Sequence, residues 1–350
     1  MTTDAIPTPN RPAASVDIED PAALLPYLHT HGLVGPSDSP RMTRLTGGVS
    51  NRIVLIEPAN RPAFVLKQAL EKLRVAADWF GSPGRIHCEA QGVRALRELA
   101  PEGTITALLF EDFREHVIAL SAVPTPHCTW KQILLAGSPR LRDFKMFGQI
   151  LGQIHARSCN NPMLAEIFED RSNFESLRIE PYYRFSAARV PAAARFLNEL
   201  IDETLSCRIC LVHGDYSPKN ILVHAGRFVL VDHEVIHCGD PAFDVGFALT
   251  HLLAKALHRE PFRRRLLEGA QLSAGAYLRC VRKAGFDRHF EARACRHTIA
   301  CLLARVAGRS PLEYLSDAER ERQIGIAMDI MNEGSFTLLQ FLSRFEEALA

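Results

Sequence analysis

The sequence predicts an α+β fold in which a small β-rich N-terminal part precedes a larger helical part. Strand-like runs bounded by Gly and Pro fill residues 41–123, and helical patterns run from Trp130 to the C-terminus with one compact loop-and-strand segment at residues 211–232. The chain has 350 residues, 47% of them hydrophobic, and a formal net charge of +1. This length suits one large domain or two ordinary ones. The small net charge favours no nucleic-acid or membrane partner.

The chain carries no export or membrane signal in its sequence pattern. Residues 1–18 are Pro-rich and poor in large apolar side chains, so we expect a disordered tail. Met1–Ser15 lacks the apolar stretch of a secretory signal, and no apolar run is long enough to cross a bilayer. The nine cysteines are then expected to be reduced thiols of a cytoplasmic protein, and the lone pair Cys207 and Cys210 has no second pair with which to bind zinc.

The N-terminal part is predicted to hold a short helix, several strands and one longer helix. Asp20 as N-cap and Pro21 at the first helical position begin a helix that extends to Leu33. The remaining expected elements are strands on both sides of the Gly47-Gly48 turn within residues 41–57, strands at 62–69, 105–110 and 116–123, and a helix at Arg85–Leu99. The boundary between the two parts is expected near Val123–Cys128, which gives an N-terminal lobe of residues 19–125 and a C-terminal lobe of residues 126–350.

The C-terminal part is predicted to be helical around one β-hairpin. Its expected helices are Trp130–Leu135, Arg140–Arg157, Pro191–Leu205 and the segments from Phe243 onward. The expected hairpin pairs residues 221–224 with residues 228–231 through the turn Ala225-Gly226.

The informative stretch is residues 211–234, which read LVHGDYSPKNILVHAGRFVLVDHE. Phosphoryl transfer from ATP needs a carboxylate that orients the acceptor hydroxyl and takes its proton, and oxygen ligands for Mg²⁺. Asp215 suits the first task, and Asn220 and Asp232 suit the second. The hairpin should bring Asn220 and Asp232 together although they are twelve positions apart. Each residue alone has common structural explanations, but the ordered set with this spacing favours catalysis.

Three segments of the chain resemble the aminoglycoside phosphotransferase / choline kinase family. They are the H-G-D-x-x-x-x-N motif at His213–Asn220, GDPAFDVGFAL at Gly239–Leu249 and LGQIHA at Leu151–Ala156. The resemblance covers roughly Leu45–Leu253. It implies a bilobal, protein-kinase-like fold with ATP between the lobes, and transfer of the γ-phosphate to a small-molecule hydroxyl acceptor.

Within this motif, two further residues are expected to support the loop, and a third has two interpretations. His213 should orient the loop by hydrogen bonds, and Asp244 should act from the start of a helix, where a carboxylate suits the exposed N–H groups. His233-Glu234 stands where protein kinases have Phe-Gly, and Glu234 has either a metal contact or a structural role.

The nucleotide-binding residues are expected in the β-rich part. By the kinase pattern, Lys67 holds the α- and β-phosphates and Glu89 is its ion-pair partner, although a lysine at a strand end can also be a surface residue. The glycine turn allows the backbone to approach a phosphate, although it can also be no more than a tight turn. Its candidate nucleotide-binding residues are Gly47, Gly48, Ser50 and Asn51.

The acceptor is least defined by the sequence. The short path from Asp232 into the next helix leaves no room for the activation segment of a protein kinase. Thr129–Gly137 resembles the corresponding stretch of methylthioribose kinases, although an amphipathic helix that packs Ile133, Leu134 and Leu135 is the favoured interpretation. Arg305 and Arg309, in ARVAGRSPLEYL, could line the acceptor pocket.

Between Lys255 and Arg309 basic residues far outnumber acidic ones, which favours a neutral or anionic acceptor such as a sugar or hydroxylated metabolite. An aminoglycoside-type antibiotic phosphotransferase is the alternative. The alternative from another class is a catalytically silent, nucleotide-binding or interaction protein. Nothing in the sequence indicates the oligomeric state.

Overall fold

The computed structural model describes residues 16–46, 50–74 and 79–350 of the chain. Most of the expected tail, residues 1–18, therefore lies outside the described residues, and so do Gly47 and Gly48. At the end of the expected tail, Ile18 is fully buried against the β-rich part.

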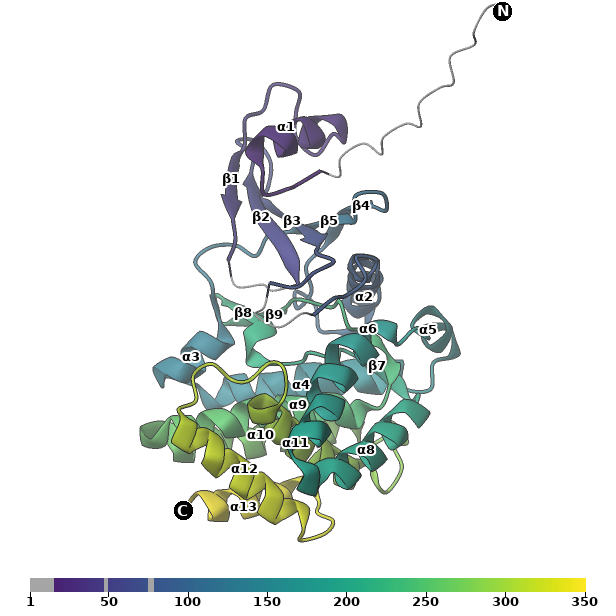
Figure 1. The fold of residues 1–350 in the computed structure, drawn as a ribbon. Helices are drawn as coiled ribbons and strands as arrows, with labels where there is room; N and C mark the ends of the chain where they lie inside the picture. Colours follow the sequence, from purple (N-terminus) through teal and green to yellow (C-terminus); the bar gives the residue numbers. More distant parts are fainter. Residues whose placement is uncertain (1–15, 47–49, 75–78) are drawn as a thin grey trace, which may run out of the picture.

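The predicted α+β fold is confirmed (Figure 1): an antiparallel sheet with two helices stands above a larger helical part. The sheet has the strand order β1-β2-β3-β5-β4. The elements of this region are α1 (Pro21–Thr30), β1 (Arg41–Arg44), β2 (Asn51–Glu57), β3 (Phe64–Ala69), α2 (Arg85–Leu99), β4 (Leu108–Asp112) and β5 (Val117–Ser121).

The predicted start of α1 is confirmed. The Asp20 carboxylate accepts a hydrogen bond from the backbone N–H of Ala22 at 3.0 Å, and Pro21 opens the helix. The helix ends at Thr30, three residues before the predicted Leu33, because Gly32 follows with a φ of +65°.

The side chains of strand β3 point alternately to the two faces of the sheet. Leu66 belongs to a hydrophobic cluster with Leu24 and Leu28 of α1. Side chains alternate across a strand, so the neighbouring Lys67 faces the opposite side, where α2 lies. Helix α2 has the predicted bounds, and its buried face includes the carboxylate of Glu89.

The helical part holds most of the core and two small sheets. Its helices are α3 (Trp130–Ala136), α4 (Leu141–Ser158), α5 (Pro162–Ile167), α6 (Ser172–Phe174), η1 (Glu175–Arg184), α7 (Phe185–Arg189), η2 (Pro191–Ala193), α8 (Ala194–Ser206), η3 (Pro218–Asn220), α9 (Pro241–His258), η4 (Glu260–Phe262), α10 (Arg263–Val281), α11 (Phe290–Ala307), α12 (Asp317–Met331) and α13 (Leu338–Leu349). Its strands are β6 (Cys128–Thr129), β7 (Cys210–Val212), β8 (Ile221–His224), β9 (Arg227–Leu230) and β10 (His237–Gly239). In the described residues, no helix is both long and apolar enough to cross a bilayer.

The helical segments α5, α6, η1 and α7, between the predicted helices, were not predicted from the sequence. Element η1 is a π-helix with Pro181 inside it. Proline has no backbone N–H and its ring clashes with the preceding turn of an α-helix, so the wider π turn accommodates it.

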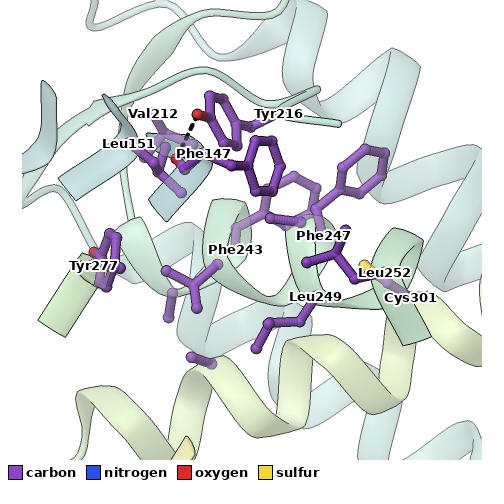
Figure 2. Close-up of a cluster of buried hydrophobic side chains, with 14 of the residues drawn as sticks. Phe147, Leu151, Val212, Tyr216, Phe243, Phe247, Leu249, Leu252, Tyr277 and Cys301 are labelled. Atoms are coloured by element: carbon purple, nitrogen blue, oxygen red, sulfur yellow. Dashed lines mark hydrogen bonds between the residues drawn. The ribbon is translucent and has the colours of Figure 1, made fainter. Parts of the chain in front are cut away.

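The core of the helical part fixes the chain beside Asp215. Figure 2 shows aromatic and aliphatic side chains gathered around α9, among them Phe243 and Phe247. Tyr216 is fully buried in this cluster, and its hydroxyl donates a hydrogen bond to the backbone carbonyl of Phe147 at 2.7 Å. Tyr216 therefore anchors the loop to α4.

Helix α3 agrees with the amphipathic interpretation of Thr129–Gly137. Thr129 and Gln132 form a capping box, and Gly137 ends the helix with a φ of +82°. Leu134 is buried, whereas Ile133 and Leu135 are partly exposed.

The stability of the fold should fall between neutral and acidic pH because histidines are buried as neutral groups. Burial lowers the pKa of His237, which stacks on Phe174, from 6.5 to about 4. The unfolded chain binds a proton at this position below pH 6.5 while the folded chain does not, so stability falls as the pH drops from 6.5 toward 4. From pH 7 to pH 5 the loss from His237 should be about 2 kcal/mol.

The measurement is urea unfolding at both pH values in wild type and His237→Asn, where the variant should lose about 2 kcal/mol less than wild type. His127→Asn, at an exposed histidine, is the matched control. An unchanged pH dependence in His237→Asn would contradict the prediction.

Candidate active site

The backbone of the segment His213-Gly214-Asp215 is hydrogen-bonded to Asp244, in the first turn of α9. The two Asp244 carboxylate oxygens accept hydrogen bonds from the backbone N–H groups of His213, at 2.6 Å, and Gly214, at 2.9 Å. His155 Nε2 lies 3.2 Å from the same carboxylate. Burial opposes the charge of Asp244, but the contacts with His155 and His213 outweigh it and lower its pKa. Asp244 therefore supports the loop from a helix start.

Gly214 is required by the shape of this loop. Its φ is +76°, and a Cβ atom there would lie 2.8 Å from the backbone carbonyl oxygen of Val235. A side chain at this position would push the loop away from the segment that follows Asp232.

His213 orients the loop through both ring nitrogens. The backbone N–H of Asp215 donates to His213 Nδ1 at 3.2 Å, so Nε2 carries the proton and faces His233 Nδ1 at 3.1 Å. Burial lowers the pKa of both histidines, which keeps them neutral. Within the described residues, the hydrogen bond between His213 and Asp215 is made by the Asp215 backbone, so His213 orients the loop, as predicted.

The Asp215 carboxylate is fixed through one of its oxygens. Asn220 Nδ2 donates to Asp215 Oδ2 at 2.7 Å, and Arg178 forms an ion pair with the same oxygen at 3.1 Å. Arg178 Nε also donates to the carbonyl of Gly214 at 2.6 Å. Within the described part of the chain, Asp215 Oδ1 accepts no hydrogen bond. It is therefore the carboxylate oxygen that remains free to accept a further hydrogen bond.

Arg178 was missed by the sequence analysis. It lies in η1, 37 positions before Asp215 and outside any motif, so no sequence signal points to it. The Asp215 carboxylate outweighs the effect of burial and raises the pKa of Arg178.

Asp232 follows β9 in a left-handed conformation with a φ of +70°. Such backbone is uncommon for residues other than glycine, although aspartate adopts it more readily than most, and it concentrates at functional sites. The N–H of Val231 donates to the carbonyl of Asn220 at 3.0 Å, so the hairpin brings Asn220 and Asp232 side by side as expected.

Lys67 joins the sheet, α2 and the hairpin. Its ammonium lies 2.6 Å from a Glu89 oxygen and 3.0 Å from Asp232 Oδ1. Burial opposes the charge of Lys67, but Asp232 and Glu89 outweigh it and raise its pKa. Burial raises the pKa of Glu89 to about 7 against the opposing effect of Lys67. The pKa of Asp232 is lowered by Lys67 despite burial.

Ser50 and Asn51 are buried beside this centre, in a network around Arg85. Arg85 donates to the carbonyl of Ser50, and its Nε lies 3.1 Å from Glu234 Oε2. Asn51 Nδ2 donates to the same Glu234 oxygen at 3.1 Å. Glu234 therefore has the structural contacts of its second interpretation, and it connects the exit of the hairpin to the start of β2.

Three oxygen atoms remain available at this centre. Within the residues that the structure describes, Asp215 Oδ1, Asn220 Oδ1 and Asp232 Oδ2 make no hydrogen bond. Carboxylate and amide oxygens are the ligands that hard divalent cations prefer. The arrangement can hold a cation between Asn220 and Asp232 and can accept a proton at Asp215.

This fold and site define a protein of the kinase-like phosphotransferase class. The family model described as "Phosphotransferase enzyme family" matches residues 41–283, and the chain belongs to that family. The family resemblance predicted from the sequence motifs is confirmed.

Curated relatives include methylthioribose kinases. The protein of Pectobacterium atrosepticum is 25% identical over 215 residues, which are 54% of this chain and 53% of that protein. The protein of Yersinia pseudotuberculosis is 24% identical over 217 residues, which are 54% of this chain and 52% of that protein. The chain spans about half the length of the curated relatives it matches.

Among solved structures, the amicoumacin kinase hAmiN in complex with AMP-PNP, Ca2+ and Ami is similar in fold. It matches with a TM-score of 0.52 and 15% identity over 90% of this chain and 96% of that one. This similarity supports the kinase-like fold.

Replacing the Asp244 carboxylate should weaken the hydrogen bonds that hold the backbone of His213 and Gly214, while the overall fold is kept. Asp244→Asn keeps one acceptor oxygen where two backbone N–H groups need one each, so a buried donor loses its partner. We expect the free energy of unfolding to fall by about 1–3 kcal/mol. Hydrogen exchange at the amides of His213 and Gly214 should accelerate.

Asp202→Asn, at an exposed aspartate of α8, is the control for this variant and should alter neither measurement. Unchanged protection of the two amides in Asp244→Asn would show that the carboxylate does not hold the loop.

Proposed function

We propose that the chain transfers the γ-phosphate of ATP to a hydroxyl group of a small sugar-like or other metabolite. The observation that carries this proposal is the joint position of Lys67, Asp215 and Asp232. Lys67 offers a buried ammonium group, Asp232 a carboxylate suited to bind a metal ion, and Asp215 a carboxylate with a free oxygen. The three groups come together from the two parts of the fold. These are the groups that phosphoryl transfer requires.

The nucleotide is proposed to bind in the N-terminal lobe, residues 19–125, against the C-terminal lobe, residues 126–350. Lys67, oriented by Glu89, supplies positive charge to the α- and β-phosphates. Gly47, Gly48, Ser50 and Asn51 are the further proposed contacts of the phosphates; of these, Ser50 and Asn51 lie in the described residues, where both are buried.

Asn220 and Asp232 are the proposed ligands of Mg²⁺. They fit because each offers an oxygen with no hydrogen bond among the described residues. Mg²⁺ would neutralise negative charge on the phosphates during transfer. Lys67 holds Asp232 in place through Oδ1 and leaves Oδ2 for the cation.

Asp215 is the proposed base. Asn220 and Arg178 hold its Oδ2, so Oδ1 is presented to the acceptor hydroxyl, orients it and takes its proton. Arg178 acts through Asp215 and is a positioning residue in this scheme.

A small-molecule acceptor is supported by the path that follows Asp232. The chain passes through β10 directly into α9 at Pro241, so no long segment is available on which a peptide would dock. The experiment is ADP release with Mg²⁺ and a panel of alcohols: methylthioribose, choline, homoserine, simple sugars and aminoglycosides. Turnover of one acceptor supports the proposal, whereas nucleotide binding without turnover of any acceptor would favour the catalytically silent alternative.

Removing the proposed base should stop chemistry without preventing nucleotide binding. Asp215→Asn keeps the size of the side chain but cannot take the proton, so kcat should fall by about two to four orders of magnitude while MgATP affinity changes little. Steady-state kinetics and calorimetry measure the two quantities. Asp202→Asn is the matched control, and near-wild-type kcat in Asp215→Asn would exclude Asp215 as the base.

Removing the proposed metal ligand should act on nucleotide binding itself. Asp232→Ala deletes a metal oxygen and one partner of Lys67, so the gain in ATP affinity on adding Mg²⁺ should disappear. Calorimetric titration of ATP with Mg²⁺ and with EDTA gives this difference. Asp202→Ala should retain the full gain, and an unchanged gain in Asp232→Ala would remove this residue from the metal site.

A further inference from the structure

A group of basic side chains lies in the helical part, where α3, α9, α11 and the segment before α12 meet. We call it the basic cluster: Lys131, His251, Lys255 and Arg305, with Tyr314 against them. The ammonium groups of Lys131 and Lys255 lie 5.8 and 5.2 Å from the Tyr314 ring centre. The segment that carries Tyr314 joins α11 to α12, in the lower part of Figure 1.

Lys255 differs from the other buried basic residues because it has no carboxylate partner among the described residues. Its exposed fraction is 1%, and its ammonium donates to the carbonyl of His251 at 3.1 Å. Among the described residues no carboxylate lies within ion-pair distance of it. The other buried lysine and arginine side chains each contact a carboxylate; they are Lys67, Arg85, Arg178 and Arg293.

The side chains around Lys255 are mainly positive and do not compensate the charge of its ammonium group. Burial, then Lys131 and Arg305, lower the pKa of Lys255 to about 7, and only Glu313 opposes them. Glu313 itself is paired with Lys131. With a pKa of about 7, Lys255 is only partly charged at neutral pH, while Lys131 and Arg305 surround it with positive charge. An anion bound in the cluster would favour the protonated form of Lys255.

Several hydrogen-bonding atoms of the cluster also lack partners. The side chain of His251 is 6% exposed, and its ring makes no hydrogen bond within the described residues. The Tyr314 hydroxyl and Arg305 Nε are buried without a partner in the same described part of the chain. Arg305 Nη1 donates hydrogen bonds to the Tyr182 hydroxyl and the Ser310 carbonyl, which leaves the remaining donors of Arg305 for a ligand.

The cluster is connected to the proposed base along α9. Arg178, which contacts Asp215, lies 5.8 Å from the Phe247 ring, and the His251 ring is 5.0 Å from Phe247. His251 and Lys255 follow Phe247 at intervals of one helical turn, about 6 Å and 12 Å farther along α9. Arg178 and Arg305 also flank the same Tyr182 ring, each at 5.6 Å.

We propose that the acceptor carries a negatively charged group, a carboxylate or a phosphate, which Lys255, His251 and Arg305 bind while its hydroxyl lies at Asp215. The inference rests on the proposed function and adds the substrate class to it. His251 and Lys255 lie about 6 and 12 Å along α9 beyond Phe247, whose ring approaches Arg178, so an acceptor of the length of a sugar acid or a sugar phosphate is proposed to connect the two sites.

The first test measures binding and needs no turnover. Calorimetry compares ribose with ribose 5-phosphate and glucose with gluconate, in wild type, in Lys255→Met and in the control Lys283→Met, at an exposed lysine near the end of α10. We expect an anionic probe to bind wild type at least tenfold more tightly than its neutral partner. Lys255→Met should reduce this preference to less than threefold, and Lys283→Met should keep it.

The second test separates binding from a structural role. If Lys255 serves to bind an anion, burying its ammonium group without a carboxylate partner destabilises the unliganded fold. Methionine has a similar length and no charge, so the Tm of the unliganded Lys255→Met protein should equal or exceed that of wild type. Both results are required. Absence of an anion preference in both pairs, or a Tm lowered in Lys255→Met and not in Lys283→Met, overturns the inference.

The two tests also distinguish this inference from the proposed function. Anion-selective binding that depends on Lys255, without ADP release from any acceptor, would support the site and contradict phosphoryl transfer. Turnover of neutral acceptors with no preference for anionic ones would leave phosphoryl transfer in place and contradict the anionic substrate.

Discussion

The arrangement of the two parts of the molecule depends on one buried ammonium group. Lys67 comes from the sheet, Glu89 from α2 and Asp232 from the exit of the hairpin, and the three charges meet within ion-pair distance. A buried charge without partners is strongly unfavourable, so the strand, the helix and the hairpin must keep their relative positions. The same contact that stabilises this arrangement places the Lys67 ammonium beside the Asp232 carboxylate.

Helix α9 plays the corresponding role on the other side of the centre. Its first turn supplies Asp244, which holds the backbone of the loop that carries Asp215. Its later turns supply His251 and Lys255, on the side of the helix that leads away from the proposed base. Because one rigid helix carries both features, the distance between the reacting hydroxyl and a bound anion would be fixed by the rise of α9.

Several elements of the fold followed from local signals. The helix at Arg85–Leu99, the hairpin after Asn220 and the capped start of α1 have short-range causes: helical periodicity, turn residues and an N-cap. The motif around Asp215 identified the family in the same way. The roles of the site residues stay proposals. The contact of Arg178 with Asp215 could not be predicted, because the two residues are 37 positions apart and Arg178 lies in a π-helix that the sequence did not indicate.

The sequence by itself determined the fold class, the family and the order of the groups around Asp215, since these depend on patterns within short segments. Only the tertiary structure decided which charges are compensated. Lys67 and Lys255 are both lysines within regular elements, yet among the residues that the structure describes, packing places two carboxylates against the first and none against the second. The difference arises from contacts between elements distant in sequence, which local periodicity does not encode. It distinguishes the lysine that is paired within the fold from the lysine that we propose binds the acceptor.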